Sequence, residues 1–215
     1  MTCRSRLIAL TLPLPLLLLT ACGGLLPRAE PLDTYRLPTT SSATTEASNI
    51  GENLQLRVDT PLAAGLVASK RIVVLPAGNE VSVYHGARWN QPAPQLLRDR
   101  LIQAFRESGQ LHAVFSDDSG LHADYVLAGT LDAFQAENRN GSQPLVVIDY
   151  DAMLLHNGND VVATRHFHIA VSSTSSAIPA VVDTFGKATD SLAAKLTSWV
   201  YQEMSQAAAA TPPDS

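Results

Sequence analysis

The chain has 215 residues, of which 46% are hydrophobic and 16% are charged, and it carries a formal net charge of -5. This length suits one domain with tails. The modest acidity argues against a nucleic-acid partner, and no cluster of Lys and Arg suggests binding to anionic lipid headgroups.

The first residues have the pattern of an export signal. Arg4 and Arg6 make a short positive start, and residues 7–19 form a largely apolar run that leads into small residues. This run is shorter than the roughly 20 apolar residues that span a membrane. Residues 1–21 are therefore predicted to be a secretory signal peptide.

The end of this signal, Leu19-Thr20-Ala21-Cys22, resembles the bacterial lipobox, in which the cysteine is acylated and becomes the first residue of the mature chain. The resemblance implies that Cys22 carries two or three acyl chains, which is enough for stable anchoring. Gly23 stands where an inner-membrane retention signal usually has Asp, which implies an anchor in the outer membrane, on its periplasmic face. Cys3 lies in the segment that would be removed, so no disulfide is expected. The alternative is an ordinary signal peptide with a cysteine near its cleavage site.

Residues 22–53 are predicted to be the lipidated cysteine and a flexible linker, because prolines punctuate them and residues 39–48 are rich in Thr, Ser and Ala. Within this stretch, Tyr35-Arg36-Leu37 could form a short strand on the domain. The domain itself is predicted to span 54–206. Residues 207–215, an alanine run followed by prolines, are predicted to be a disordered tail.

Hydrophobic periodicity predicts six strands and two helices in the domain. Strands are expected at 54–59, 71–75, 80–84, 125–134, 145–156 and 161–171, with helices at 91–108 and 178–204. Asn157-Gly158-Asn159-Asp160 predicts a hairpin between the last two strands. The order of strands, helix, strands, helix predicts an α+β domain, with two amphipathic helices packed on a mostly antiparallel sheet.

Several segments carry a resemblance to a known family. They are Arg71-Ile72-Val73-Val74-Leu75, Glu80-Val81 through Tyr84, Arg88-Trp89-Asn90-Gln91-Pro92, Asp124-Tyr125-Val126-Leu127-Ala128-Gly129 and Leu131-Asp132-Ala133-Phe134. Together with the lipobox and the order of elements, they resemble the ABC-type transport auxiliary lipoprotein family, from roughly Tyr35 to Met204. Asn90-Gln91 departs from the Ala-Glu of many relatives, which leaves open any role of that acidic side chain.

The resemblance implies a partner role rather than catalysis. Members of the family act with MCE-domain proteins and with an ABC permease and ATPase, in systems thought to move phospholipid or related lipids across the cell envelope. The chain is then expected to dock the MCE protein at the outer membrane, as a non-enzyme without a cofactor, and a homo-oligomeric ring around the MCE tube would be natural. The sequence contains no phosphate-binding loop of the Gly-x-x-x-x-Gly-Lys-Ser/Thr type.

The last two predicted strands bring four chemically active side chains onto one face. If residue 156 pairs with residue 161, the facing pairs are Asp149 with His168 and Asp151 with His166. Two imidazoles and two carboxylates could bind zinc or another divalent ion. We expect instead a solvated ladder of His–Asp pairs, because a flat sheet face rarely converges four ligands tetrahedrally.

The segment from Tyr84 to Trp89 is predicted to be a glycine-containing loop that contacts a partner. Tyr84, Arg88 and Trp89 are the candidate contact residues, because exposed aromatic and arginine side chains anchor interfaces. The alternative is that Trp89 caps the core at the start of the helix.

Two other functions stay open beside the transport accessory. An outer-membrane lipoprotein could regulate a periplasmic cell-wall enzyme with the same architecture, because fold alone does not fix function. A linker of about 30 residues spans about 30 Å as a coil and about 100 Å when extended, which favours a partner that comes to the outer membrane. The third and weaker hypothesis is a metal-dependent enzyme on the His/Asp face.

Overall fold

The computed structural model describes residues 32–39, 51–76, 80–138 and 143–210. Outside these ranges lie the predicted signal peptide, Cys22, part of the predicted linker and residues 77–79. The elements are β1 (Asp33–Tyr35), β2 (Gly51–Val58), β3 (Arg71–Leu75), β4 (Ser82–Trp89), α1 (Ala93–Ser108), β5 (Leu111–Ser116), η1 (Asp117–Ser119), β6 (Tyr125–Glu137), β7 (Leu145–His156), β8 (Asp160–Ser172) and α2 (Ile178–Ala210).

Strand β6 organises the sheet. Its first residues pair in parallel with β2, its last residues pair in parallel with β3, and its whole length pairs with antiparallel β7. In the sheet, β8 lies next to β7 and β5 lies next to β2. β4 lies next to β3, and β1 lies next to β4. The meander β6–β7–β8 is antiparallel, as the sequence predicted, while the N-terminal strands add parallel pairs and make the eight-stranded sheet mixed.

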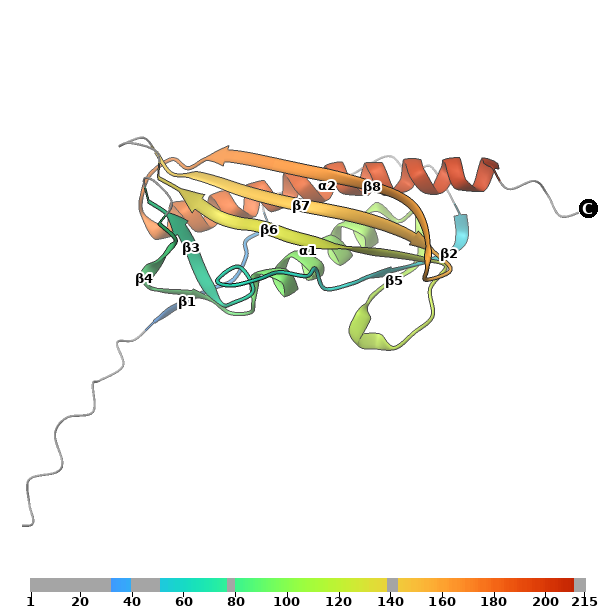
Figure 1. Cartoon of the computed structure of the whole chain (residues 1–215), viewed down its shortest axis with the longest axis horizontal. Helices are drawn as coiled ribbons and strands as arrows, with labels where there is room; N and C mark the ends of the chain where they lie inside the picture. Colours follow the sequence, from blue (N-terminus) through green and yellow to red (C-terminus); the bar gives the residue numbers. More distant parts are fainter. Residues whose placement is uncertain (1–31, 40–50, 77–79, 139–142, 211–215) are drawn as a thin grey trace, which may run out of the picture. The chain divides into compact units, whose positions relative to one another are not determined.

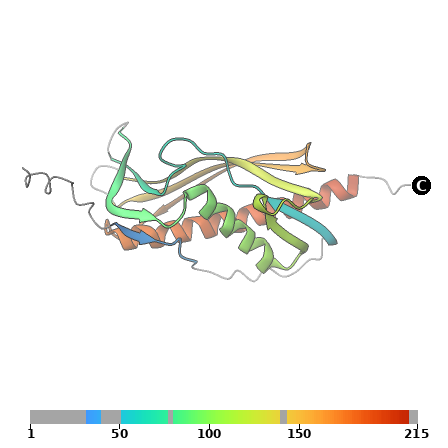
Figure 2. The same cartoon turned by 90° about the horizontal axis from the view of Figure 1, so that it is seen from below.

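Both α-helices cover the same face of this sheet (Figures 1 and 2). The core lies between them and the sheet, where Leu97 and Phe105 of α1, Phe185 and Leu196 of α2, and Tyr150 of β7 are all fully buried. This confirms the prediction of two amphipathic helices packed on one sheet. Neither helix in the described part of the chain is long and apolar enough to cross a membrane.

The ends of the helices follow local chemistry. Helix α1 begins at Ala93 rather than at residue 91, because the residue before it, Pro92, is the N-cap with a non-helical ψ of 143°. It ends at Ser108 as predicted, with Gly109 in the left-handed conformation at φ 66°. Helix α2 continues to Ala210, since alanine has the highest helix propensity. The segment 207–215 predicted as a tail therefore begins inside α2, and residues 211–215 lie outside the described ranges.

Part of the predicted linker belongs to the sheet. β1 pairs in parallel with β4, and the backbone N–H of Asn90 donates a hydrogen bond to the Tyr35 carbonyl at 2.8 Å. The chain then passes against α2 at Gly186, where a Cβ would lie 2.6 Å from the Pro38 carbonyl oxygen. The short strand expected at 35–37 thus lies two residues earlier, at Asp33–Tyr35, and this segment is tied to both layers of the domain.

β4 is longer than predicted and replaces the expected loop at 84–89. Its register with β3 shifts between the pairs Arg71–Arg88 and Val73–Val83, so extra residues bulge out of β4. Gly86 has a φ of 73°, which only glycine adopts without strain. The glycine that suggested a loop therefore permits a bulge within a strand.

Candidate functional site

The first candidate contact, around Trp89, is closed off by the rest of the domain. Trp89 is fully buried and packs edge-on against Phe185, with ring centroids 5.2 Å apart, and against Phe134 at 6.0 Å. The prediction of an exposed Trp89 is therefore wrong, and the alternative of a core residue at the start of α1 holds. Of the other two residues, Arg88 is exposed and donates from Nε to Thr34 Oγ1 of β1 at 3.1 Å. Tyr84 is partly buried, which raises the pKa of its phenol.

The second candidate, the His/Asp face, forms with the predicted pairs. Asp149 faces His168 and Asp151 faces His166, with Nδ1 of each imidazole in hydrogen-bond contact with its carboxylate, at 2.7 Å for the second pair. The register near the turn differs, because His156 pairs with Asp160 and the strands bulge between Leu154 and Leu155. Farther along the strands the predicted register is restored.

This face is an exposed ladder of His and Asp side chains. Among the described residues, no group of three or more His, Cys, Asp or Glu side chains could hold a metal ion. His166 and His168 have side chains 55% and 58% exposed, so both imidazoles stay in water. Asp132, at the bulge in β6, joins the ladder, and its pKa is raised by desolvation, by a hydrogen bond to Asp151 and by the charge of Asp149. Carboxylates therefore outnumber imidazoles here.

An apolar hollow of about 570 Å³ lies next to the ladder, on the face of the sheet opposite the helices. Ala128, Met153 and Thr164 line it from three adjacent strands, and Leu62 lines it from the segment between β2 and β3. Leu62 is held there by backbone hydrogen bonds to Gly129 and Leu131 at 2.9 and 2.7 Å, and yet its side chain is 74% exposed. No local sequence pattern indicates this hollow, since it depends on pairing between distant segments.

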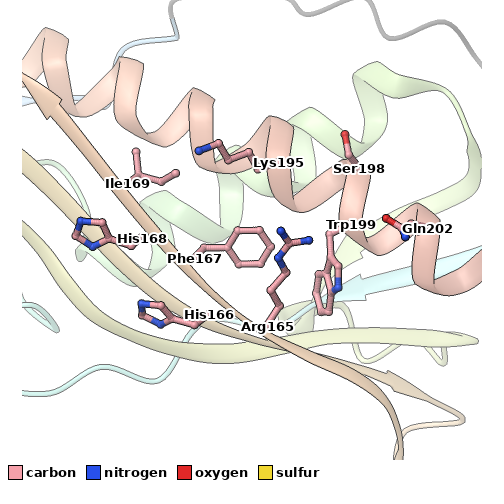
Figure 3. A pocket seen from close by; sticks show the side chains of 9 residues that line it. All are labelled: Arg165, His166, Phe167, His168, Ile169, Lys195, Ser198, Trp199 and Gln202. Carbon is pink, nitrogen blue, oxygen red and sulfur yellow. The ribbon is translucent and has the colours of Figure 1, made fainter.

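A second hollow of about 420 Å³ runs between β8 and α2, and we call it the edge groove (Figure 3). Phe167 and Ile169 of β8 and Trp199 of α2 form its apolar floor, with the Phe167 and Trp199 rings edge-to-face at 5.8 Å. Arg165 lies over the Phe167 ring, with its guanidinium carbon 5.2 Å from the ring centroid. Lys195, Ser198 and Gln202 of α2 complete the opposite side.

The edge groove is cationic. Arg165 and Lys195 are both exposed, the residues that line the groove include no carboxylate, and neither cation has an ion pair within the described chain. In Figure 3 the Arg165 side chain reaches from β8 toward Phe167 and Trp199. Sequence reasoning placed Trp199 in the buried stripe of α2 but did not single out Arg165 or Lys195. One local signal existed, because residues 163, 165, 167, 169 and 171 share a strand face and Arg165 interrupts an otherwise apolar row.

Comparisons with known proteins agree with this fold. The family model described as the ABC-type transport auxiliary lipoprotein component matches residues 35–197. The crystal structure of protein XCC0632 from Xanthomonas campestris is similar with a TM-score of 0.75 and 32% identity, covering 82% of this chain and 98% of that one. No protein with a curated description matches the chain.

Two more distant structures show the fold alone. The crystal structure of an uncharacterized protein matches with a TM-score of 0.63 and 18% identity, covering 80% of this chain and 99% of that one. The hypothetical protein CT253 from Chlamydia trachomatis matches with a TM-score of 0.51 and 6% identity, covering 71% of this chain and 98% of that one.

Proposed function

The chain belongs to the ABC-type transport auxiliary lipoprotein family, and we propose that it is a non-enzymatic accessory subunit of an MCE-type ABC transport system that moves lipid across the cell envelope. The observation that carries the proposal is the extent of the family match. It runs from the last residue of β1 to Thr197 in α2, so it includes β2 through β8 and all of α1.

Its proposed location is the periplasmic face of the outer membrane, with Cys22 as the lipidated residue. The lipobox at 19–22, the glycine that follows it and the lipoprotein character of the family support this location. The docking of β1 limits the distance between anchor and domain. Asp33 lies only 11 positions after Cys22, and 11 residue steps span at most about 40 Å when fully extended.

This short connection supports a partner that comes to the membrane. An extended linker of about 30 residues would reach about 100 Å, but a fixed β1 removes most of that length. A docked MCE protein, with its ABC permease and ATPase beyond it, fits this geometry better than a regulator that reaches into the cell wall. A ring of several copies around the MCE tube is part of the proposal.

The test is a capture experiment with the full chain and the MCE-domain protein from the same cell. We expect specific capture of the MCE protein, and we expect Cys22→Ser to remove the chain from the outer-membrane fraction while capture persists in detergent. Absence of the MCE protein, with a cell-wall synthase captured in its place, would support the regulator instead.

A further inference from the structure

The sheet ends in three strands that have a partner on one side only within the described residues: β1, β5 and β8. β1 has three residues and β5 has six, whereas β8 has 13. β8 pairs with β7 alone, so along its outer side the backbone N–H and C=O groups that point away from β7 meet no other strand of the described chain. A long edge of this kind is a template for another strand.

The edge groove gives this edge a chemical preference. It extends beside β8 from Arg165 to Ile169, about 13 Å at 3.3 Å per residue, and along α2 from Lys195 to Gln202, about 10 Å at 1.5 Å per residue. Phe167, Ile169 and Trp199 form its buried floor. The lining side chains that reach solvent are the cations Arg165 and Lys195 and the polar residues His166, His168, Ser198 and Gln202. The chain as a whole has a net charge of -5, so the positive charge of these two neighbouring cations is opposite in sign to that of the whole chain.

We propose that the outer edge of β8 is a docking site for an extended acidic segment of a partner protein. The segment adds to the sheet as a strand beside β8, and one of its carboxylates lies between Arg165 and Lys195. Main-chain hydrogen bonds along β8 supply affinity, while the two cations select the side chains. The net charge of -5 on the whole chain disfavours an acidic segment at places without such a pair of cations.

Other occupants fit these features less well. A second copy paired through its own β8 would bring two cationic grooves together, which costs free energy through like-charge repulsion. A ring contact joins different faces of neighbouring copies and is not subject to this repulsion, so the oligomeric state of the double variant below tests it. An anionic membrane surface attracts clusters of four or more Lys and Arg, whereas the groove has two cations. A lipid headgroup would also leave the backbone edge of β8 unpaired. The proposal rests on the proposed function in one respect, namely that the segment belongs to the protein that docks on this subunit.

The experiment uses two synthetic ten-residue peptides of alternating valine and threonine, one carrying two glutamates and the other two lysines at the same places. Binding of each labelled peptide to the full chain, purified in detergent, is measured by fluorescence anisotropy. Hydrogen exchange of the β8 amides is followed in the same samples. A third peptide carries the glutamates with N-methyl groups on alternate residues, which removes the donors needed for a strand ladder.

We expect the glutamate peptide to bind at least about tenfold more tightly than the lysine peptide, and to slow exchange of the β8 amides. The double variant Arg165→Glu with Lys195→Glu should reverse the preference, and the N-methylated peptide should not bind. The matched control is Arg71→Glu with Lys187→Glu, which changes two other exposed cations, one of them on α2, and should leave binding unchanged.

Several outcomes would overturn the proposal. Equal binding of the two charged peptides, binding of the N-methylated peptide, or unchanged β8 exchange would each do so. Vesicles of phosphatidylglycerol that bind through the same two cations, without peptide binding, would identify a lipid headgroup as the occupant. A change in oligomeric state caused by the double variant would identify a second copy. No transporter component is present in these measurements, so their failure is distinct from failure of the capture experiment.

Discussion

The two tryptophans of this chain lie in similar aromatic clusters at opposite ends of the sheet, and the clusters differ in what covers them. Trp89 packs with Phe134 and Phe185, and beyond β4 the sheet continues into β1. Trp199 packs with Phe167, and beyond β8 the described chain adds no strand. Both tryptophans are buried, with Trp89 0% and Trp199 4% exposed, so the next strand decides whether the sheet edge beside the cluster is covered, and not whether the cluster is core.

The charged side chains beside the two aromatic clusters differ in the same way. Near Trp89, Arg88 is engaged by Thr34 of the covering strand β1. At the other end, Arg165 lies on the Phe167 ring and Lys195 has no ion pair among the described residues. At the covered edge, Arg88 forms its hydrogen bond to the covering strand, whereas Arg165 and Lys195 at the β8 edge stay exposed to a partner.

Trp89→Ala should have the largest effect, because it empties the closed cluster. We expect the free energy of unfolding to fall by about 3–5 kcal/mol, as for other buried Trp truncations. Urea unfolding followed by circular dichroism measures this. Arg88→Ala, at the neighbouring exposed position, is the control and should change stability by less than about 0.5 kcal/mol. A loss below about 1 kcal/mol for Trp89→Ala would mean that the cluster is not closed.

Gly186→Ala tests the covering segment itself. The added Cβ would lie 2.6 Å from the Pro38 carbonyl oxygen, so the segment after β1 must move away from α2. We expect a loss of about 1–3 kcal/mol and faster hydrogen exchange in β1. Helix propensity alone predicts the opposite sign, since alanine is favoured over glycine by about 1 kcal/mol. Ala194→Gly, at an exposed position of α2, reports that propensity term separately.

Arg165→Ala and Lys195→Ala should leave the stability of the open end nearly unchanged. Neither side chain has an ion pair among the described residues, and an exposed contact of Arg165 with the Phe167 ring contributes about 0.5–1 kcal/mol at most. Thermal and urea unfolding of both variants provide the check. A loss well above about 1 kcal/mol in either variant would show that the cations support the fold rather than serve a partner.

Asp132→Asn should have the smallest effect, with a gain in stability at pH 7. The pKa of Asp132 is raised in the folded chain, first by desolvation and then by its interactions with Asp151 and Asp149. The folded state therefore binds its proton more readily than the unfolded state, and stability falls as pH rises through that window. Removing the charge should restore a few tenths of a kcal/mol, because an exposed site is screened.

The control is the acidic end of the same pH series. The gain should vanish when the pH falls below the ordinary carboxyl range, because Asp132 is then protonated in both the folded and the unfolded chain. A gain for Asp132→Asn that persists in acid would point to packing rather than charge.

Local patterns in the sequence predicted those features that depend on neighbouring residues. The antiparallel meander, both helices and the pairing of Asp149 with His168 follow from periodicity and from one turn at 157–160. The burial of Trp89 was one of two alternatives that the sequence left open, because the outcome depends on β1, which is distant in the sequence and pairs in parallel with β4. The edge groove likewise combines β8 with the second half of α2, which no turn connects directly. Hydrophobic periodicity carries no information about such contacts between segments that are distant in the sequence.

The position of β6 also determines the order in which the domain can fold. In a chain exported N-terminus first, as the predicted signal peptide requires, β2 and β3 emerge long before their partner. Leu56 pairs with Tyr125 and Val73 pairs with Gln135, so β4, α1 and β5 must all appear before either pairing can form. The hairpins of the β6–β7–β8 meander instead close as soon as each strand appears, because local pairings form fastest. The β3–β4 pair can also close early, but β2 has no partner until β5 appears, and one side of β3 stays open until β6 appears. We therefore expect this N-terminal half to be the half that a chaperone protects during folding.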